Sequence, residues 1–289
     1  MNENLTIFDV KQKSKEWLDL RKGYISASSV ATALRMNGEE KYNEYITEKK
    51  SGVSNFHGNS ATHFGELFED IARSIFEHYT DFSVKEYGFI VNKKYNCLGV
   101  SPDGVLDNGD LLEIKCPYTR IIDGVIKNDY YHQIQLQGSV MESKNCYFLE
   151  CKFKLEQSDT ANFINTLDTS TVTGLINISG DSIGVLPWER KIINYGPIYY
   201  PGSISTINEE NYFNYREPLS TIDYINKVNK FNCKYGTLWK YSLITISCQK
   251  VPIDPEWINH YYKRLQSVHD EINEDITECL FDFEENKLI

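Results

Sequence analysis

The spacing of apolar and polar residues along this chain of 289 residues predicts both helices and strands. The clearest amphipathic helix covers residues 64–79, where Leu67, Ile71 and Ile75 recur with helical periodicity. Further helices are expected over residues 15–20, 29–35, 41–50, 128–141 and from 255 onward. Strands are expected over residues 83–91, 97–100, 111–116, 144–154 and 237–247. The pattern indicates an α/β fold with a central mixed β-sheet flanked by helices.

Two of the expected helices carry start signals. Ser26 or Ser28 is expected to cap the helix over residues 29–35 through its hydroxyl oxygen. Asp254 is expected to cap the last helix, with Pro255 at the first helical position. Each signal fixes the point at which a helix, with its unpaired backbone N–H groups, begins.

The stretch from residue 99 to 117 brings several polar groups together at the edge of the predicted sheet. Its turn, residues 107–110, reads Asp-Asn-Gly-Asp and predicts a β-hairpin. In the strand that follows, alternation places Glu113 and Lys115 on the same face, and Asp103 lies across the hairpin from them. Two carboxylates and an ammonium in this arrangement favour a divalent-metal site, because Mg²⁺ prefers carboxylate oxygens and retained water.

Each polar residue of the hairpin has a predicted role at that metal site. Asp103 and Glu113 are expected to bind the metal, and the backbone carbonyl of Ile114 is a further ligand. Lys115 is expected to orient the attacking water or help to deprotonate it. The alternative is an ordinary Glu/Lys pair on a solvated face. The apolar residues around the pair disfavour it, since a buried charge must be paired or bind metal.

These same residues resemble a known family. The letters PDG, a short hairpin and LEIKCP resemble the core of PD-(D/E)XK nucleases, whose fold is restriction-endonuclease-like. More narrowly they are similar to the lambda exonuclease family, also called YqaJ-type viral recombinase nucleases, and to the related viral alkaline nucleases. The resemblance implies DNA hydrolysis that depends on one or two Mg²⁺ ions, with Mn²⁺ as a substitute.

Three further segments carry the resemblance. Residues 21–28 match the R-x-G-x-I-[ST]-A-S of the family's terminal-phosphate pocket, which implies that Arg21 and Ser28 bind the 5′-phosphate and that Ser101 completes the pocket. Residues 64–73 match a family helix whose Glu supports a metal-bound water, which implies that role for Glu69, although Phe64 replaces the family's Trp. Residues 130–135 match Y-x-x-Q-x-Q, which implies that Gln133 approaches the active site. From the residues alone, the three segments read as a capped helix with a surface Arg, a solvated acidic face and a polar helix face.

Composition limits the class of protein. The 7 Cys are scattered without a CxxC pair, which argues against a disulfide framework, a zinc finger or a four-Cys iron–sulfur cluster and favours small buried side chains in a reducing compartment. No apolar run is long enough to span a membrane, so a soluble, intracellular protein is expected, in the nucleus or cytoplasm of an infected host if it is viral. The net charge of −11 opposes a nucleic-acid function, unless a local basic groove coexists with acids elsewhere.

The domain organisation follows from where the resemblance ends. We expect one nuclease domain over residues 1–289, with a family-divergent insertion over residues 155–250. Within it, Trp188 and Trp239 have basic neighbours and are candidates for stacking on bases, although a scaffold or lid explains the segment equally well.

Together these features predict an Mg²⁺-dependent exonuclease that degrades linear double-stranded DNA from the 5′ end, in viral or phage-type recombination, repair or end processing. Expected partners are duplex DNA ends and a single-strand annealing protein. Relatives form ring-shaped trimers, so a homo-oligomer is expected from the resemblance. The alternatives are an endonuclease or DNA/RNA nuclease of the same fold, a non-catalytic nucleic-acid-binding protein, and a recombinase partner whose acidic C-terminal segment is the contact.

Overall fold

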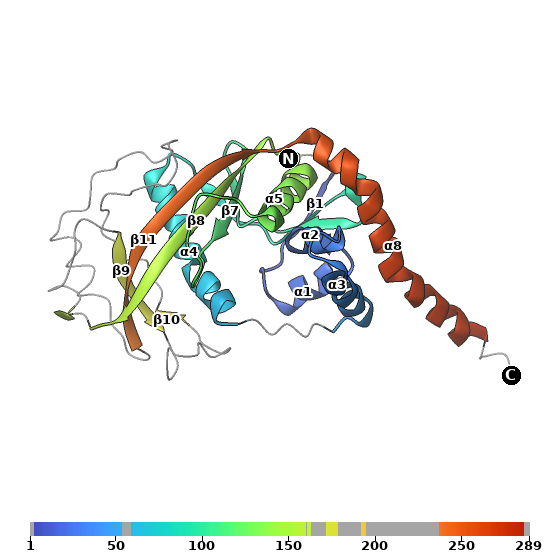
Figure 1. The fold of residues 1–289 in the computed structure, drawn as a ribbon, viewed down its shortest axis with the longest axis horizontal. Helices are drawn as coiled ribbons and strands as arrows, with labels where there is room; N and C mark the ends of the chain where they lie inside the picture. Colours follow the sequence, from blue (N-terminus) through green and yellow to red (C-terminus); the bar gives the residue numbers. More distant parts are fainter. Residues whose placement is uncertain are drawn as a thin grey trace.

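The computed structural model describes residues 3–53, 59–159, 161–162, 172–178, 192–194 and 237–285. Figure 1 shows a long, strongly curved sheet at one end of the molecule and a smaller sheet with several helices beside it. The large sheet has seven strands in the order β10-β9-β11-β8-β7-β6-β3, and the small sheet has four in the order β1-β4-β5-β2. Both sheets are mixed, because β7 pairs with β8 and β2 pairs with β5 in parallel while the other pairs are antiparallel.

The described chain alternates between the two sheets and their helices. The helices are α1 (Lys15–Lys22), α2 (Val30–Ala33), α3 (Glu39–Ser51), α4 (Ser60–Tyr79), α5 (Asn128–Met141) and α8 (Pro255–Glu285), with short 3₁₀ turns η1 (Ala27–Ser29) and η2 (Lys93–Tyr95). The strands are β1 (Leu5–Phe8), β2 (Ile25–Ser26), β3 (Val84–Lys85), β4 (Phe89–Asn92), β5 (Leu98–Val100), β6 (Gly104–Leu106), β7 (Leu111–Lys115), β8 (Asn145–Gln157), β9 (Thr173–Ile178), β10 (Ile192–Asn194) and β11 (Thr237–Pro252).

Helix α4 covers one face of the large sheet. Its apolar stripe, predicted from the periodicity of residues 64–79, is buried against Leu112 and Ile114 of β7 and against β8 and β11. The opposite side of β7 meets α5, where Leu111 packs with Ile134 and Phe148. The two faces of β7 therefore pack against different helices, as the alternation of its residues predicted.

The small sheet, α2, α3 and α8 form a second core. Trp257, Ile258, Leu265 and Val268 of α8 are buried in it, as the helical periodicity predicted. Asp254 caps α8 by accepting a hydrogen bond from the backbone N–H of Glu256 at 2.9 Å, which confirms the predicted start signal. Helix α5 contributes Leu136 and Val140 to this core, so it packs between the two sheets (Figure 1).

The predicted hairpin is present. β6 and β7 pair in register from Gly104 with Leu112, and Gly109 in the turn has a φ of +84°. A left-handed φ is strained for side chains with a Cβ, so the glycine explains why the chain can reverse there. The hairpin places Asp103 immediately before β6 and Glu113 opposite it in β7.

Several local predictions were wrong. Residues 83–91 do not form one strand, because β3 belongs to the large sheet and β4 to the small one. The strand is interrupted near Gly88, where a Cβ would lie 2.1 Å from the carbonyl oxygen of Val10. No side-chain hydrogen bond caps η1 or α2, because the Ser26 and Ser28 hydroxyls accept from Arg21 instead.

Trp239 is partly buried and packs against the core of the large sheet. Trp188 and most of the predicted insertion lie outside the described residues.

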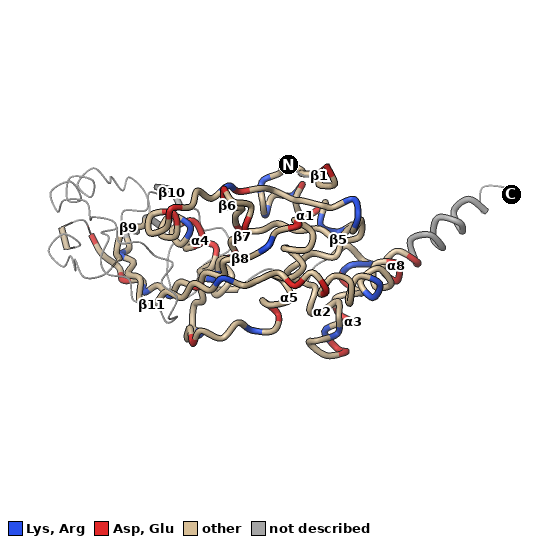
Figure 2. The backbone as a smooth tube through the Cα atoms, turned by 90° about the horizontal axis from the view of Figure 1, so that it is seen from above, with Lys and Arg blue, Asp and Glu red and all other residues tan. Residues whose placement is uncertain are grey.

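Five of the cysteines, Cys97, Cys116, Cys146, Cys151 and Cys248, are free and buried, as expected for small apolar side chains. No helix in the described ranges is long and apolar enough to cross a membrane. Along the described backbone, positive and negative residues are interspersed (Figure 2).

Candidate active site

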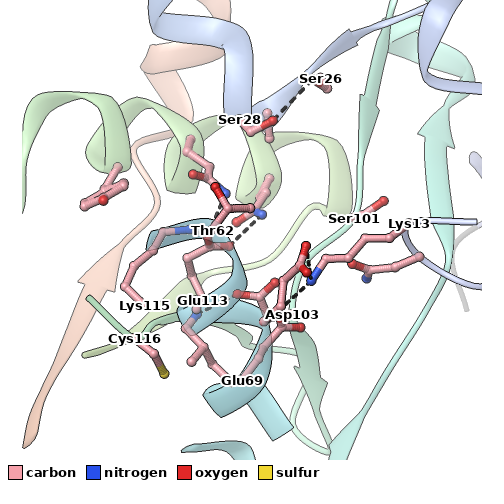
Figure 3. Close-up of a pocket in the computed structure, with 18 of the residues that line it drawn as sticks. Lys13, Ser26, Ser28, Thr62, Glu69, Ser101, Asp103, Glu113, Lys115 and Cys116 are labelled. Atoms are coloured by element: carbon pink, nitrogen blue, oxygen red, sulfur yellow. Dashed lines mark hydrogen bonds and ion pairs between the residues drawn. The ribbon is translucent and has the colours of Figure 1, made fainter. Parts of the chain in front are cut away.

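One pocket of about 610 Å³ lies between α4, α5, the β6–β7 hairpin and the segment that joins β1 to α2. All nine residues that the sequence singled out line it: Arg21, Ser28, Glu69, Ser101, Asp103, Glu113, Ile114, Lys115 and Gln133. They come from segments as much as 112 residues apart in the chain, from Arg21 to Gln133. The fold therefore brings the predicted metal-binding and phosphate-binding residues into a single cavity (Figure 3).

Glu113 lies at the floor of this pocket and is almost fully buried, with a side-chain exposure of 1%. One carboxylate oxygen, Oε1, accepts hydrogen bonds from the Lys115 ammonium and from Gln133 Nε2, the latter at 2.6 Å. The other oxygen, Oε2, accepts from Gln137 Nε2 at 2.9 Å. Both oxygens of this buried charge are thus held in place by donors on β7 and α5.

Asp103 lies across the hairpin from Glu113. Its Oδ2 accepts a hydrogen bond of 2.7 Å from the backbone N–H of Ile114, which fixes the carboxylate at the end of β7. Burial and the charges of Glu113 and Glu69 raise the pKa of Asp103 well above its usual value. The group consequently needs a proton or a nearby cation to be stable in this place.

Lys115 is the cation on the same face of β7. Burial opposes its charge, but the carboxylates of Glu113 and Asp103 outweigh that effect and raise the pKa of Lys115 above its usual value. Its Nζ also lies 5.2 Å from the centre of the Tyr130 ring. Lys115 is therefore an ammonium held between acids and an aromatic face.

Glu69 reaches the pocket from α4. Its Oε1 lies 3.5 Å from the guanidinium of Arg73, and its Oε2 accepts a hydrogen bond of 3.1 Å from Lys13. Glu69, expected here from the family resemblance, lies with the acids of the hairpin in the pocket (Figure 3). It is paired with two cations.

The chemistry of these donors fits a hard divalent cation. Asp103 and Glu113 supply carboxylate oxygens, and the charge of Glu69 adds to theirs at Asp103. Within the described ranges, no three His, Cys, Asp or Glu side chains are grouped closely enough to hold a metal between them. One or two carboxylates with retained water is the coordination that Mg²⁺ favours, so the pair Asp103 and Glu113 suits that ion.

A second cluster lines the same pocket at the end of α1. Arg21 Nη2 donates to the hydroxyls of Ser26 and Ser28, each at 2.8 Å, and its guanidinium stacks 4.2 Å from the centre of the Trp17 ring. Trp17 Nε1 donates to Ser101 Oγ at 2.8 Å. Among the described residues, no carboxylate lies within ion-pair distance of Arg21. A rigidly held guanidinium with hydroxyl neighbours and no acidic partner is suited to binding an anion.

The segment after β7 forms another wall of the pocket through Pro117, Tyr118 and Arg120. The Arg120 guanidinium is paired with the carboxylate of Glu150, which is buried in β8 with a side-chain exposure of 1%. Lys152 lies two residues after Glu150 in β8. Its Nζ donates to the carbonyl oxygens of Pro117 and Arg120, both at 3.2 Å. Strand β8 therefore fixes the path of this wall.

Sequence reasoning missed several of these residues. Gln137 lies one helical turn after Gln133, so the spacing i to i+4 was a signal that could have identified it. Its amide oxygen is buried and has no hydrogen-bond partner in the described part of the chain. Lys13 and Trp17 gave no local signal, because their roles depend on contacts with Glu69 and Ser101 in the folded chain. Ser26 was expected as a helix cap, and its contact with Arg21 became visible only in the fold.

Part of this chain matches a known protein family. The family model of the YqaJ-like viral recombinase domain matches residues 16–144, the part that contains every predicted site residue. Over this stretch the chain is similar to the YqaJ-like viral recombinase domain family. An uncharacterized protein of Acanthamoeba polyphaga mimivirus is 28% identical over 231 residues, which is 69% of this chain and 41% of that protein. The chain thus spans about two fifths of the length of that relative.

Solved structures show the fold of this chain. An alkaline exonuclease from Laribacter hongkongensis has a TM-score of 0.55 and 18% sequence identity, covering 96% of this chain and 100% of that one. A second structure of the same enzyme, in complex with dAMP, gives the same values. The predicted restriction-endonuclease-like α/β fold is confirmed.

Proposed function

We propose that this chain is a metal-dependent deoxyribonuclease that hydrolyses phosphodiester bonds at the 5′ ends of linear double-stranded DNA, in viral or phage-type recombination or end processing. The observation that carries the proposal is that one pocket contains both the hairpin acids, Asp103 and Glu113, and the Arg21 cluster, which is formed by Arg21, Trp17, Ser26, Ser28 and Ser101. The family match over residues 16–144 supports it, as does the exonuclease named among the structural neighbours, which has been solved with the mononucleotide dAMP.

In this proposal Asp103 and Glu113 hold Mg²⁺, with the Ile114 carbonyl as a further ligand and Glu69 acting through water. Bound Mg²⁺, one ion or two, supplies an activated water and a Lewis acid for the phosphoryl oxygens, and Mn²⁺ substitutes for it. Gln133 and Gln137 keep the Glu113 carboxylate in position by donating to its two oxygens.

Lys115 orients the attacking water and stabilises negative charge on the phosphoryl group. In the metal-free pocket the neighbouring carboxylates raise the pKa of Lys115, so the side chain is an ammonium there; its second proposed role is to help deprotonate the water once a metal is bound.

In this proposal the Arg21 cluster makes the enzyme prefer the 5′ end of a DNA strand. Arg21 and Ser28, with Ser101 held by Trp17, bind the terminal 5′-phosphate, and the acids lie in the same cavity at the adjoining phosphodiester. A guanidinium that stacks on an aromatic ring is well placed to bind phosphate oxygens in a fixed orientation. An internal phosphodiester has no such terminal group, so closed circular DNA should be a poor substrate.

The overall charge of −11 does not exclude this function. The pocket is lined by five cationic residues, Lys13, Arg21, Lys115, Arg120 and Lys127, and by four acids, Glu66, Glu69, Asp103 and Glu113. Bound divalent ions add positive charge at the acids, so the cavity has the local polarity that a DNA strand needs.

The test is cleavage of end-labelled linear duplex DNA and of the same DNA as a closed circle. Each is incubated with the wild type and with Lys115→Ala, in Mg²⁺ and in EDTA. We expect Mg²⁺-dependent release of nucleotides from the linear DNA, no cleavage of the circle, and loss of at least about 100-fold in rate for the variant. Equal cleavage of the circle would point to an endonuclease. DNA binding without cleavage in any divalent metal would point to a non-catalytic binding protein.

A further inference from the structure

Lys13 places a positive charge inside the acidic cluster of the pocket. Its Nζ lies 3.1 Å from Glu69 Oε2 and 3.7 Å from Glu66 Oε1, both on α4. Figure 3 shows the side chain reaching from the segment before α1 toward Glu69 and Asp103. The ammonium thus contacts Glu69, the carboxylate that the proposed function expects to support a metal-bound water.

The backbone holds Lys13 in this place at a cost. Its φ is +67°, in the left-handed region that residues with a side chain rarely adopt. Such a conformation costs on the order of 1 kcal/mol and persists only when neighbouring contacts impose it. The adjacent Gln12 is tied to distant segments, because its amide donates to the carbonyl oxygens of Tyr87 at 2.9 Å and Pro102 at 3.2 Å. Because Gln12 directly precedes Lys13 and Pro102 directly precedes Asp103, this contact holds the two segments side by side.

Two carboxylates of α4, those of Glu69 and Glu66, attract the Lys13 ammonium. The side chain nevertheless remains 48% exposed, with a flexible stem of four carbons that can turn toward solvent. Lys13 is therefore an ammonium that can leave Glu69 when a stronger cation arrives.

We propose that Lys13 is a tethered cation that neutralises the Glu69 side of the pocket and is displaced when a divalent metal binds. The proposal rests on the metal-dependent function above, and it adds that the Lys13 ammonium competes with the metal for the acidic side chains. Lys13 keeps the acids paired in the metal-free protein, at the expense of affinity for the metal. A variant without the ammonium should bind the metal more tightly.

The experiment measures Mn²⁺ binding to the full chain without DNA, by the loss of the free-ion signal in electron paramagnetic resonance. Lys13→Met removes the charge, and Lys13→Gly removes the charge together with the backbone strain, so the second variant tests the idea even if the first folds poorly. Both are expected to bind Mn²⁺ roughly three- to tenfold more tightly than the wild type, the range that one partly exposed charge contributes. Lys13→Arg should bind like the wild type.

Lys22→Met is the matched control, because Lys22 forms an ion pair of 2.8 Å with Asp19 outside the pocket. Its affinity for Mn²⁺ should equal that of the wild type. Unchanged or weaker binding in both Lys13 variants would overturn the proposal.

The variant Asp103→Asn distinguishes a failure of the proposed role of Lys13 from a failure of the proposed metal site. If the wild type binds Mn²⁺ no better than Asp103→Asn, the proposed metal site fails and the role of Lys13 fails with it. If Asp103→Asn alone loses binding and the Lys13 variants match the wild type, only the role of Lys13 fails.

Discussion

Replacing Arg120 by Met should destabilise the protein strongly, because it leaves the carboxylate of Glu150 buried without its cation. The Glu150 side chain is 1% exposed, and its second oxygen, Oε2, already has no hydrogen-bond partner among the described residues. Removing one partner of a buried ion pair costs about 3–5 kcal/mol. Arg120 itself is 20% exposed, so we expect a loss of about 3 kcal/mol, at the low end of that range.

Urea denaturation in EDTA measures this loss as the change in the free energy of unfolding. Adding Glu150→Gln to Arg120→Met removes the uncompensated charge, so the double variant should be more stable than Arg120→Met alone. Lys22→Met is the control for an exposed pair, and it should unfold like the wild type. A loss below about 1 kcal/mol for Arg120→Met, or no recovery in the double variant, would refute the reasoning.

Three further predictions follow from other contacts. Gln137→Leu should lower the rate of DNA cleavage about 10-fold or more with little change in KM, because Glu113 Oε2 loses its donor; an unchanged rate would contradict this. Gly99→Ala should destabilise the protein by about 1–3 kcal/mol in thermal unfolding, since the new Cβ would lie 2.1 Å from the Phe89 ring, and a wild-type midpoint would contradict it. Asp103→Asn should raise the free energy of unfolding of the metal-free protein near pH 7, measured by urea denaturation in EDTA. The folded-state pKa of Asp103 is raised, so the stability of the wild type is full below the unfolded pKa near 3.9 and falls as the pH rises toward the folded value. The gain should therefore vanish near pH 3, and an equal gain at both pH values would contradict the argument.

Local chemistry explains which parts of the fold could be predicted. The turn at residues 107–110 and helix α5 follow from short signals, a glycine at a left-handed position and a helical repeat. The alternation of β7 also predicted that Glu113 and Lys115 share a face, because the period of a strand is fixed by its backbone.

Contacts between distant segments explain the rest. The break at Gly88 depends on the carbonyl of Val10, which no local pattern of residues 83–91 reveals. The pairing of Lys13 with Glu69 joins positions 56 residues apart and became visible only in the folded chain. Arg21 was predicted from the family motif, but its contacts with Ser26 and the Trp17 ring were not.

The central claim is that the Arg21 cluster and the hairpin acids act on one DNA end in one pocket. It is tested most directly by the ratio of cleavage rates on linear duplexes that carry a 5′-phosphate or a 5′-hydroxyl, for the wild type, Arg21→Met and the control Lys22→Met. A hydrogen-bonded charge contributes about 1.5–3 kcal/mol, so the wild type and Lys22→Met should prefer the phosphate by roughly 10- to 100-fold. Arg21→Met should bring the ratio near one and leave the rate on the 5′-hydroxyl duplex largely unchanged. A wild type that is indifferent to the end, or an Arg21→Met variant that loses both rates equally, would contradict the account.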